Sequence, residues 1–411
     1  MGWRKTQWDG CKMDENIQKL IKNKFLKGAL LGALVMLSIM LIALAVLLRN
    51  PQANSLDVAT DKKLEEINEL IMDNFLFQED IEATSLLEGL YRGYVAELGD
   101  IYSEYYSPKE ADEVTENIKG QYSGVGAVLS QDAETKIVTM IHIYKNSPAE
   151  RAGLKDGDIV YKVEGEEIIG LTLEEVALRL RGPVDTDVEV TVYRGVPVEE
   201  VTVTATREQI DVETVIYEMK DDSVGYIRVT EFNQVTLDQY REALAELKDQ
   251  GIKGLVVDLR NNPGGSLNVV TDMVSEMLPA KTGIFTMKDS KGNEEVVLST
   301  GKESFDLPTV VLVNQFSASA SEIYAGAMQD AKAAKIVGMN TFGKGIIQQI
   351  FELGDGSSVK LTIAEYFTPD GNKIHGIGVV PDVEVKFEAD KTNEDADNQL
   401  EEALKIIKED L

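Results

Sequence analysis

Cysteine and histidine are almost absent from this chain, and both absences restrict its chemistry. The only cysteine among 411 residues is Cys11, so no intrachain disulfide can form. Because Cys11 precedes a long apolar stretch, a cysteine nucleophile in the main body of the chain is excluded. The two histidines, His142 and His375, are too few for a multi-histidine zinc site and leave at most two candidates for a Ser-His-Asp triad. We therefore expect no metal, no other cofactor, and stability that comes from packing.

Basic side chains are scarce outside the N-terminal region. Residues 1–49 hold eight Lys/Arg and three Asp/Glu, which leaves the other 362 residues with 33 basic and 68 acidic side chains. Binding to phosphates needs a concentrated basic face, so nucleic acid is excluded as a partner of the main body. A composition of 43% hydrophobic and 27% charged residues predicts two or three folded domains.

The one long hydrophobic run lies near the N-terminus. Residues Gly28 to Leu48 contain no charge, and 21 helical residues just span a hydrocarbon core of about 30 Å. Seven Lys/Arg precede the run and an acidic chain follows it, so the positive-inside rule places residues 1–27 in the cytoplasm and the large domain outside it. A cleaved signal peptide is the alternative, but the run is longer than a usual signal core. We predict a single-pass anchor in the cell membrane.

The rest of the chain divides into regions of different periodicity. A helical repeat of apolar residues covers 57–118, short strands broken by Gly and Pro turns cover 119–206, and strands alternate with helices through 207–387. An acidic linker and an amphipathic helix occupy 388–411. The pattern predicts a multidomain α+β and α/β protein with an N-terminal helical lobe, a compact β module and a layered α/β core.

A serine-rich turn follows one of the buried strands. In Ser317-Ala318-Ser319-Ala320-Ser321-Glu322, small residues join the strand 309–314 to a helix, a junction that exposes a side chain on a rigid support. Backbone N–H groups at the start of the helix, such as that of Ala320, can face a developing oxyanion. Taken alone, the serines are also compatible with ordinary helix capping.

A serine nucleophile needs a base, and neither histidine is well placed. His142 lies in an apolar strand, and His375 in a Gly-rich loop without an orienting carboxylate, so lysine is the alternative. Lys344 lies between Gly343 and Gly345 in an apolar setting, where burial can lower its pKa from the usual value of about 10.4. Gln348, four residues later, can orient the amine without adding charge, or can be an ordinary polar strand residue.

A second Gly-rich turn ends another buried strand. The segment Asn261-Asn262-Pro263-Gly264-Gly265 again precedes a helix, so Gly264 or Gly265 can supply a second oxyanion donor. A turn without a function is an equally good interpretation of this segment in isolation.

Taken together, residues 60–387 resemble the C-terminal processing peptidases, also called tail-specific proteases. The resemblance rests on S-A-S-A-S-E, on T-F-G-K-G with its lysine 25 residues after the middle serine, on the glutamine four further on, and on N-x-P-G-G. It implies a crotonase-like core with Ser319 as nucleophile, Lys344 as base and Gln348 as its support. Phe316 departs from the family, which often has glycine at that position.

The β module resembles the PDZ domain of the same family. The signature is Ser147-Pro148-Ala149-Glu150-Arg151-Ala152-Gly153-Leu154 with Gly157-Asp158. The resemblance implies that the loop Ser123-Gly124-Val125-Gly126-Ala127 binds the C-terminal carboxylate of a polypeptide substrate with an apolar tail. It also suggests that Arg181 links the PDZ domain to the protease, although an arginine capping a helix end is the simpler interpretation.

These observations predict a membrane-anchored serine endopeptidase that cleaves extracytoplasmic proteins near their C-termini. The alternative is a catalytically inactive PDZ scaffold, which the presence of the serine, lysine, glutamine and glycine turn argues against. A trypsin-like PDZ protease lacks a credible His and Asp. The amphipathic helices at 57–97 and 398–411 further predict homodimer contacts, because such helices need a partner surface.

Overall fold

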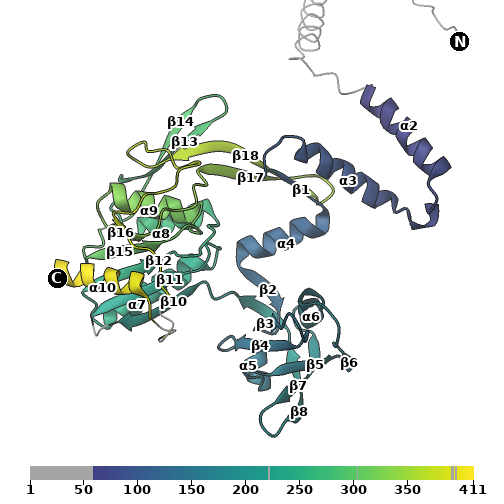
Figure 1. Cartoon of the computed structure of the whole chain (residues 1–411), viewed down its shortest axis with the longest axis horizontal. Coiled ribbons are helices and arrows are strands. Elements are labelled where there is room, and N and C mark those ends of the chain that lie inside the picture. The colour runs from purple at the N-terminus through teal and green to yellow at the C-terminus, as the bar shows by residue number, and fades with distance from the viewer. Residues whose placement is uncertain (1–58, 221–222, 303, 390–392, 394–395) are drawn as a thin grey trace, which may run out of the picture. The chain divides into compact units, whose positions relative to one another are not determined.

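The computed structural model describes residues 59–411 except 221–222, 303, 390–392 and 394–395 (Figure 1). The predicted membrane span and the basic N-terminus lie outside these residues. Within the described residues, no helix combines the length and apolarity needed to cross a bilayer.

The core is built on a six-stranded sheet in the order β10-β11-β12-β15-β16-β19 (Figure 1). Only the β10–β11 pair is antiparallel. The strands are β10 (Val215–Lys220), β11 (Val224–Val229), β12 (Gly254–Asp258), β15 (Thr309–Val313), β16 (Lys335–Gly338) and β19 (Val383–Glu384). Every residue of β12 and β15 is buried, which explains their unbroken apolar sequences.

Helices pack on both faces of this sheet because alternate residues of each strand point to opposite sides. On one face, Val257 and Val311 join the main hydrophobic core with α7 (Thr236–Asp249), α8 (Leu267–Ser275) and α9 (Ala320–Asp330). On the other face, Val256 and Val310 pack against the C-terminal helix α10 (Asn398–Asp410), whose Ala403, Ile406 and Ile407 are buried. The apolar face of α10 is therefore covered by its own chain, and it no longer argues for a dimer contact.

A second sheet completes the core. It has the order β1-β18-β13-β14, with β17 paired to β18. Its strands are β1 (Glu104–Tyr106), β13 (Gly283–Asp289), β14 (Glu294–Leu298), β17 (Ile346–Glu352) and β18 (Ser358–Phe367). Phe285 and Tyr366 join the same hydrophobic core as α8 and α9. The arrangement is the layered α/β architecture that the alternation of strands and helices predicts.

The β module has its own hydrophobic core. Five strands run in the order β3-β4-β5-β7-β8, with a short β6 on β5. The elements are β3 (Ala127–Gln131), β4 (Val138–Ile143), α5 (Pro148–Ala152), β5 (Ile159–Val163), β6 (Glu166–Glu167), α6 (Leu173–Leu180), β7 (Asp187–Arg194) and β8 (Glu199–Thr206). The buried carboxylate of Asp158, in the Gly157-Asp158 turn, forms an ion pair with the partly exposed Arg194 at 2.6 Å. Strands β2 (Gln121–Gly124) and β9 (Glu208–Asp211) pair where the chain enters and leaves this module.

The predicted helical region 57–118 contains three α-helices. It also contains strand β1, which its helical periodicity did not predict. Helix α2 (Ala59–Asn74) and the 3₁₀ turn η1 (Gln78–Asp80) belong to a separate unit that ends at Ser85. An ion pair between Arg92 and Glu110, 2.9 Å apart, joins α3 (Ala83–Ala96) to α4 (Pro108–Lys119). Strand β1 pairs with β18, so the segment just before β1 becomes part of the core.

Candidate active site

The three serines of the turn between β15 and α9 have different environments. Ser317 is fully buried, and its hydroxyl donates to the Leu259 carbonyl at 2.7 Å. Ser321 is also fully buried and donates to the Asn262 carbonyl at 3.0 Å. The Ser319 hydroxyl donates no hydrogen bond to a described residue, and the side chain is partly exposed. Of the three, only Ser319 has a hydroxyl whose proton is not donated to the neighbouring turn.

Ser319 has a strained backbone. Its φ of 53° and ψ of −111° lie outside the usual regions for a residue with a Cβ atom. Strain of this kind costs about 1–3 kcal/mol and is found at functional sites. The surrounding structure holds it in place, since the Ser319 N–H donates to Glu322 at 2.9 Å and its carbonyl accepts from the Tyr366 hydroxyl at 3.0 Å.

Ser319 lines a cleft of about 510 Å³ together with Ala320, Gly265 and Gln348. Much of the remaining wall is apolar and comes from the core and from α4, with Val114, Ile118, Phe232, Leu267, Ile323, Ile346 and Ile347 among the lining residues. The cleft can accept an extended segment with an apolar side chain beside the serine.

The Gly-rich turn after β12 lies directly against the serine. A Cβ atom added to Gly264 would be 2.9 Å from the Ser319 Cβ. The Gly264 N–H is occupied, because it donates to the Asn262 side chain at 2.8 Å. Among the described residues, no group accepts a hydrogen bond from the N–H of Gly265 or from that of Ala320. The structure therefore leaves Gly265 and Ala320, rather than Gly264, with N–H groups available to a ligand.

Lys344 lies in the loop before β17, half-buried in the protein. Burial lowers the pKa of its amine, the nearby positive charge of Lys360 lowers it further, and Asp100 and Glu322 act in the opposite direction. The lowered pKa favours the neutral amine that a general base requires. The amine lies 4.8 Å from the centre of the Tyr102 ring and makes no hydrogen bond to Ser319. The Gln348 amide donates to the Ile346 carbonyl at 3.3 Å instead of to the lysine.

Two buried groups that the sequence analysis did not assign connect the serine loop to the lysine loop. The Glu322 carboxylate accepts from the Ser319 N–H at 2.9 Å, from Lys344 N–H at 2.8 Å and from Thr341 at 2.6 Å. Burial raises the pKa of Glu322, and these hydrogen bonds oppose the rise. The Tyr366 hydroxyl donates to the carbonyls of both Ser319 and Lys344, at 3.0 and 2.7 Å. Glu322 had one usable signal, its position three residues after the serine that caps α9.

The predicted carboxylate-binding loop of the β module connects β2 to β3. Val125 is buried, and Gly126 has a φ of 83°, with the Ser147 Cβ 2.4 Å from where its own Cβ would lie. Ser123 donates through its hydroxyl to the Gly182 carbonyl at 2.5 Å. The following strand β3 is at the edge of its sheet, so its outer side is open to an added strand.

Arg181 ends α6 and contacts both β2 and α4. Its guanidinium lies 5.0 Å from the centre of the Tyr122 ring in β2 and 3.7 Å from the Glu116 carboxylate in α4. Because α4 also contributes to the wall of the cleft, Arg181 contacts a helix that lines the candidate active site.

Comparison with known proteins finds a family for each of two parts of the chain. Residues 223–385 match peptidase family S41, and residues 142–194 match the PDZ domain. A probable CtpA-like serine protease of Staphylococcus aureus is 36% identical over 334 residues, covering 81% of this chain and 66% of the relative. The counterpart in Staphylococcus epidermidis is 34% identical over 360 residues, covering 87% of this chain and 72% of the relative.

Similarity extends to solved structures, one of which shows the same fold. An S41 protease from Bacteroides fragilis superposes with a TM-score of 0.51 at 18% identity, over 84% of this chain and 97% of that one. A photosystem II D1 C-terminal processing protease is 31% identical, with a TM-score of 0.45, over 78% of this chain and 86% of that one. The sequence match to the Staphylococcus relatives carries the conclusion that this chain, with its PDZ domain, belongs to peptidase family S41.

Proposed function

We propose that this protein is a serine endopeptidase in which Ser319 is the nucleophile and Lys344 the general base. The observation that carries the proposal is the environment of Ser319. Its hydroxyl donates to no described residue and lies in an apolar cleft, beside two N–H groups that bind no described acceptor. The half-buried lysine with a lowered pKa comes from the adjacent loop, which Glu322 and Tyr366 hold against the serine loop.

In the proposed reaction, the neutral Lys344 amine takes the proton of the Ser319 hydroxyl as the oxygen attacks the substrate carbonyl. The resulting oxyanion accepts hydrogen bonds from the Gly265 and Ala320 N–H groups. The C–N bond then breaks, and the protonated lysine gives its proton to the leaving amine. Water hydrolyses the acyl-enzyme by the same steps. Because the lysine amine lies over Tyr102, it has to turn towards Ser319 for the first step, and Gln348, which lines the same cleft as Ser319, is proposed to orient it there.

The PDZ domain is proposed to select the substrate. An apolar C-terminal tail adds as a strand to β3, and its carboxylate meets the backbone N–H groups of the loop 123–127. Arg181 is proposed to couple tail binding in the PDZ domain to α4 and the cleft, through its contacts with Tyr122 and Glu116.

The sequence and the exposed apolar surface support proposals for the location and the assembly of the protein. The uncharged run 28–48 is proposed to anchor the protein in the cell membrane, with the protease outside the cytoplasm. Large apolar side chains of α3, including Leu86, Leu87, Leu90 and Tyr94, are exposed, which supports a homodimer formed through the N-terminal helices.

Covalent labelling tests the assignment of the nucleophile. The full-length protein, treated with a fluorophosphonate probe and digested, is expected to carry the label on Ser319, as found by mass spectrometry. Ser319→Ala should remove the label. A label on another residue, or persistent labelling of the alanine variant, would place the active site elsewhere, and absence of any label in the wild type would favour an inactive PDZ scaffold.

A further inference from the structure

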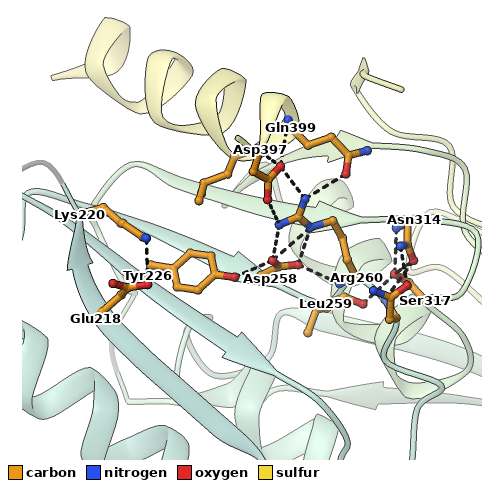
Figure 2. A network of polar contacts seen from close by, with 12 residues as sticks. Glu218, Lys220, Tyr226, Asp258, Leu259, Arg260, Asn314, Ser317, Asp397 and Gln399 are labelled. Carbon is orange, nitrogen blue, oxygen red and sulfur yellow. Dashed lines mark hydrogen bonds and ion pairs between the residues drawn. The ribbon is translucent and has the colours of Figure 1, made fainter. Parts of the chain in front are cut away.

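A largely buried arginine lies directly before the Gly-rich turn and is held by two carboxylates. Arg260 donates from Nη2 to Asp258 at 2.6 Å and to Asp397 at 2.7 Å, so its guanidinium bridges the end of β12 and the start of α10 (Figure 2). Asp258 also accepts from the Tyr226 hydroxyl at 2.7 Å. The Arg260 side chain is 12% exposed and that of Asp258 only 2%. Bidentate pairs of this kind fix geometry as well as charge.

The second carboxylate comes from a part of the chain that is 137 residues away. Asp397 is the N-cap of α10, and its side chain accepts from the Leu400 N–H at 3.0 Å while it binds Arg260. Gln399, in the first turn of α10, accepts from Arg260 at 3.0 Å and donates to the Val385 carbonyl at 2.7 Å. The beginning of α10 thus forms one wall of the arginine site.

Beyond Arg260, the chain is joined to the serine loop by a second set of hydrogen bonds. Asn261 and Asn314 form a reciprocal pair, from the Asn261 N–H to the Asn314 side chain at 3.0 Å and from the Asn314 amide to the Asn261 side chain at 2.9 Å. The Asn262 carbonyl accepts from the Ala318 N–H at 3.0 Å and from Ser321. A shift of Arg260 would therefore be transmitted to both the turn 261–265 and the loop that carries Ser319.

The position of Arg260 depends on both carboxylates. A guanidinium with one of its two carboxylate partners removed would keep its charge in a buried site with fewer hydrogen bonds, which is costly enough to move the side chain or admit water. The backbone N–H of Arg260 also donates to Asp258 at 2.9 Å. Movement of the Arg260 side chain would therefore also strain the backbone of the turn. Asn261, the next residue, already has a φ of 61°.

We propose that Arg260 is a positioning residue for the oxyanion turn and that the N-terminus of α10, through Asp397 and Gln399, completes its site. The C-terminal helix is then required for the chemical step, in addition to covering one face of the sheet. This inference rests on the proposed role of the turn 261–265 in the reaction of Ser319.

The test compares two carboxylate-to-amide changes on the same helix in the full-length protein. Asp397→Asn keeps a good helix N-cap but removes the bidentate partner of Arg260. Asp410→Asn, the control, removes only the exposed ion pair of α10 with Lys335. With a peptide substrate, Asp397→Asn is expected to lower kcat about tenfold or more while KM changes little, since misplacement of catalytic groups affects the transition state more than binding. Asp410→Asn should retain both constants.

A second variant distinguishes the loss of an Arg260 partner from unfolding of α10. Gln399→Ala leaves the N-cap intact and removes one Arg260 partner, so a smaller fall in kcat is expected in a protein with the wild-type circular dichroism spectrum. Wild-type kcat in both Asp397→Asn and Gln399→Ala would overturn the inference, as would a change confined to KM. If Ser319→Ala remains active in the same assay, the proposed function has failed; if it is inactive and the α10 variants are normal, only this inference has failed.

Discussion

At the residue scale, the account depends on the difference between three neighbouring serines. Ser317 and Ser321 use their hydroxyls to join the serine loop to the β12 turn, whereas Ser319 has no such bond. The resemblance to the C-terminal processing peptidases selected Ser319, Lys344 and Gln348 as candidates, and the structure brings Ser319 and Gln348 to one cleft. The contact of Lys344 with Tyr102 could not be predicted, because it depends on β1 joining a strand far along the chain.

Removal of either of two charges near Lys344 should shift the pH profile of kcat/KM, in opposite directions for the two charges. Activity should rise with pH as Lys344 loses its proton. Lys360→Gln removes a like charge that lowers the Lys344 pKa, so the acid limb of the profile should move to higher pH. Asp100→Asn removes a negative charge that raises the Lys344 pKa, so the limb should move to lower pH. Shifts in the same direction, or none, would contradict lysine as the base.

At the scale of elements, the turn 261–265 needs glycine for two reasons. Gly265 has a φ of 141°, and an added Cβ would lie 2.4 Å from the Phe232 carbonyl oxygen. Gly265→Ala is therefore expected to displace the turn and to lower kcat by about 10²–10³, the usual cost of losing an oxyanion donor. Initial rates of peptide cleavage by folded protein measure this effect.

Gly251→Ala is the matched control, because Gly251 has a φ of 81° but open space around its Cβ position. It should cost about 1 kcal/mol of stability in thermal unfolding and leave kcat unchanged. An equal loss of activity in both variants would mean that positive φ alone, and not the contact with Phe232, explains the result.

The sequence predicted the main strands and helices of the core well, because β12 and β15 are buried on both faces and read as continuous apolar runs. The hairpin β13–β14 was not predicted, since β14 is mostly exposed and carries Glu294 and Glu295 in place of an apolar alternation. Helix α8 ends at Ser275, and just beyond it the carbonyls of Met277 and Leu278 accept from Phe305 and Ser299, which lie far along the chain. The packing of α10 against its own sheet was also missed, because amphipathicity does not identify the partner surface.

At the scale of the whole molecule, the contacts of Arg181 with β2 and α4 predict that tail binding and cleavage are coupled. The measurement is the ratio of cleavage rates for a substrate with an apolar C-terminal tail and for one ending in aspartates. Arg181→Ala is expected to bring this ratio close to one. Arg179→Ala, which removes only an exposed pair with Glu166, should keep the wild-type ratio. An unchanged ratio in Arg181→Ala would assign Arg181 to helix capping alone.

The proposed anchor predicts how the protein fractionates. The full-length chain should remain with membranes during extraction at alkaline pH, with a mass that includes residues 1–49. A chain found in the soluble fraction, shortened by the length of the apolar run, would instead show that this segment is a cleaved signal peptide.

The most direct test of the central claim compares the full-length wild type with Ser319→Ala and Lys344→Ala on an unfolded protein that ends in a small apolar residue. Products are followed by mass spectrometry. The account predicts cleavage near the C-terminus by the wild type and loss of at least about 10³-fold in both variants. Cleavage by all three proteins at similar rates would contradict a Ser319–Lys344 active site.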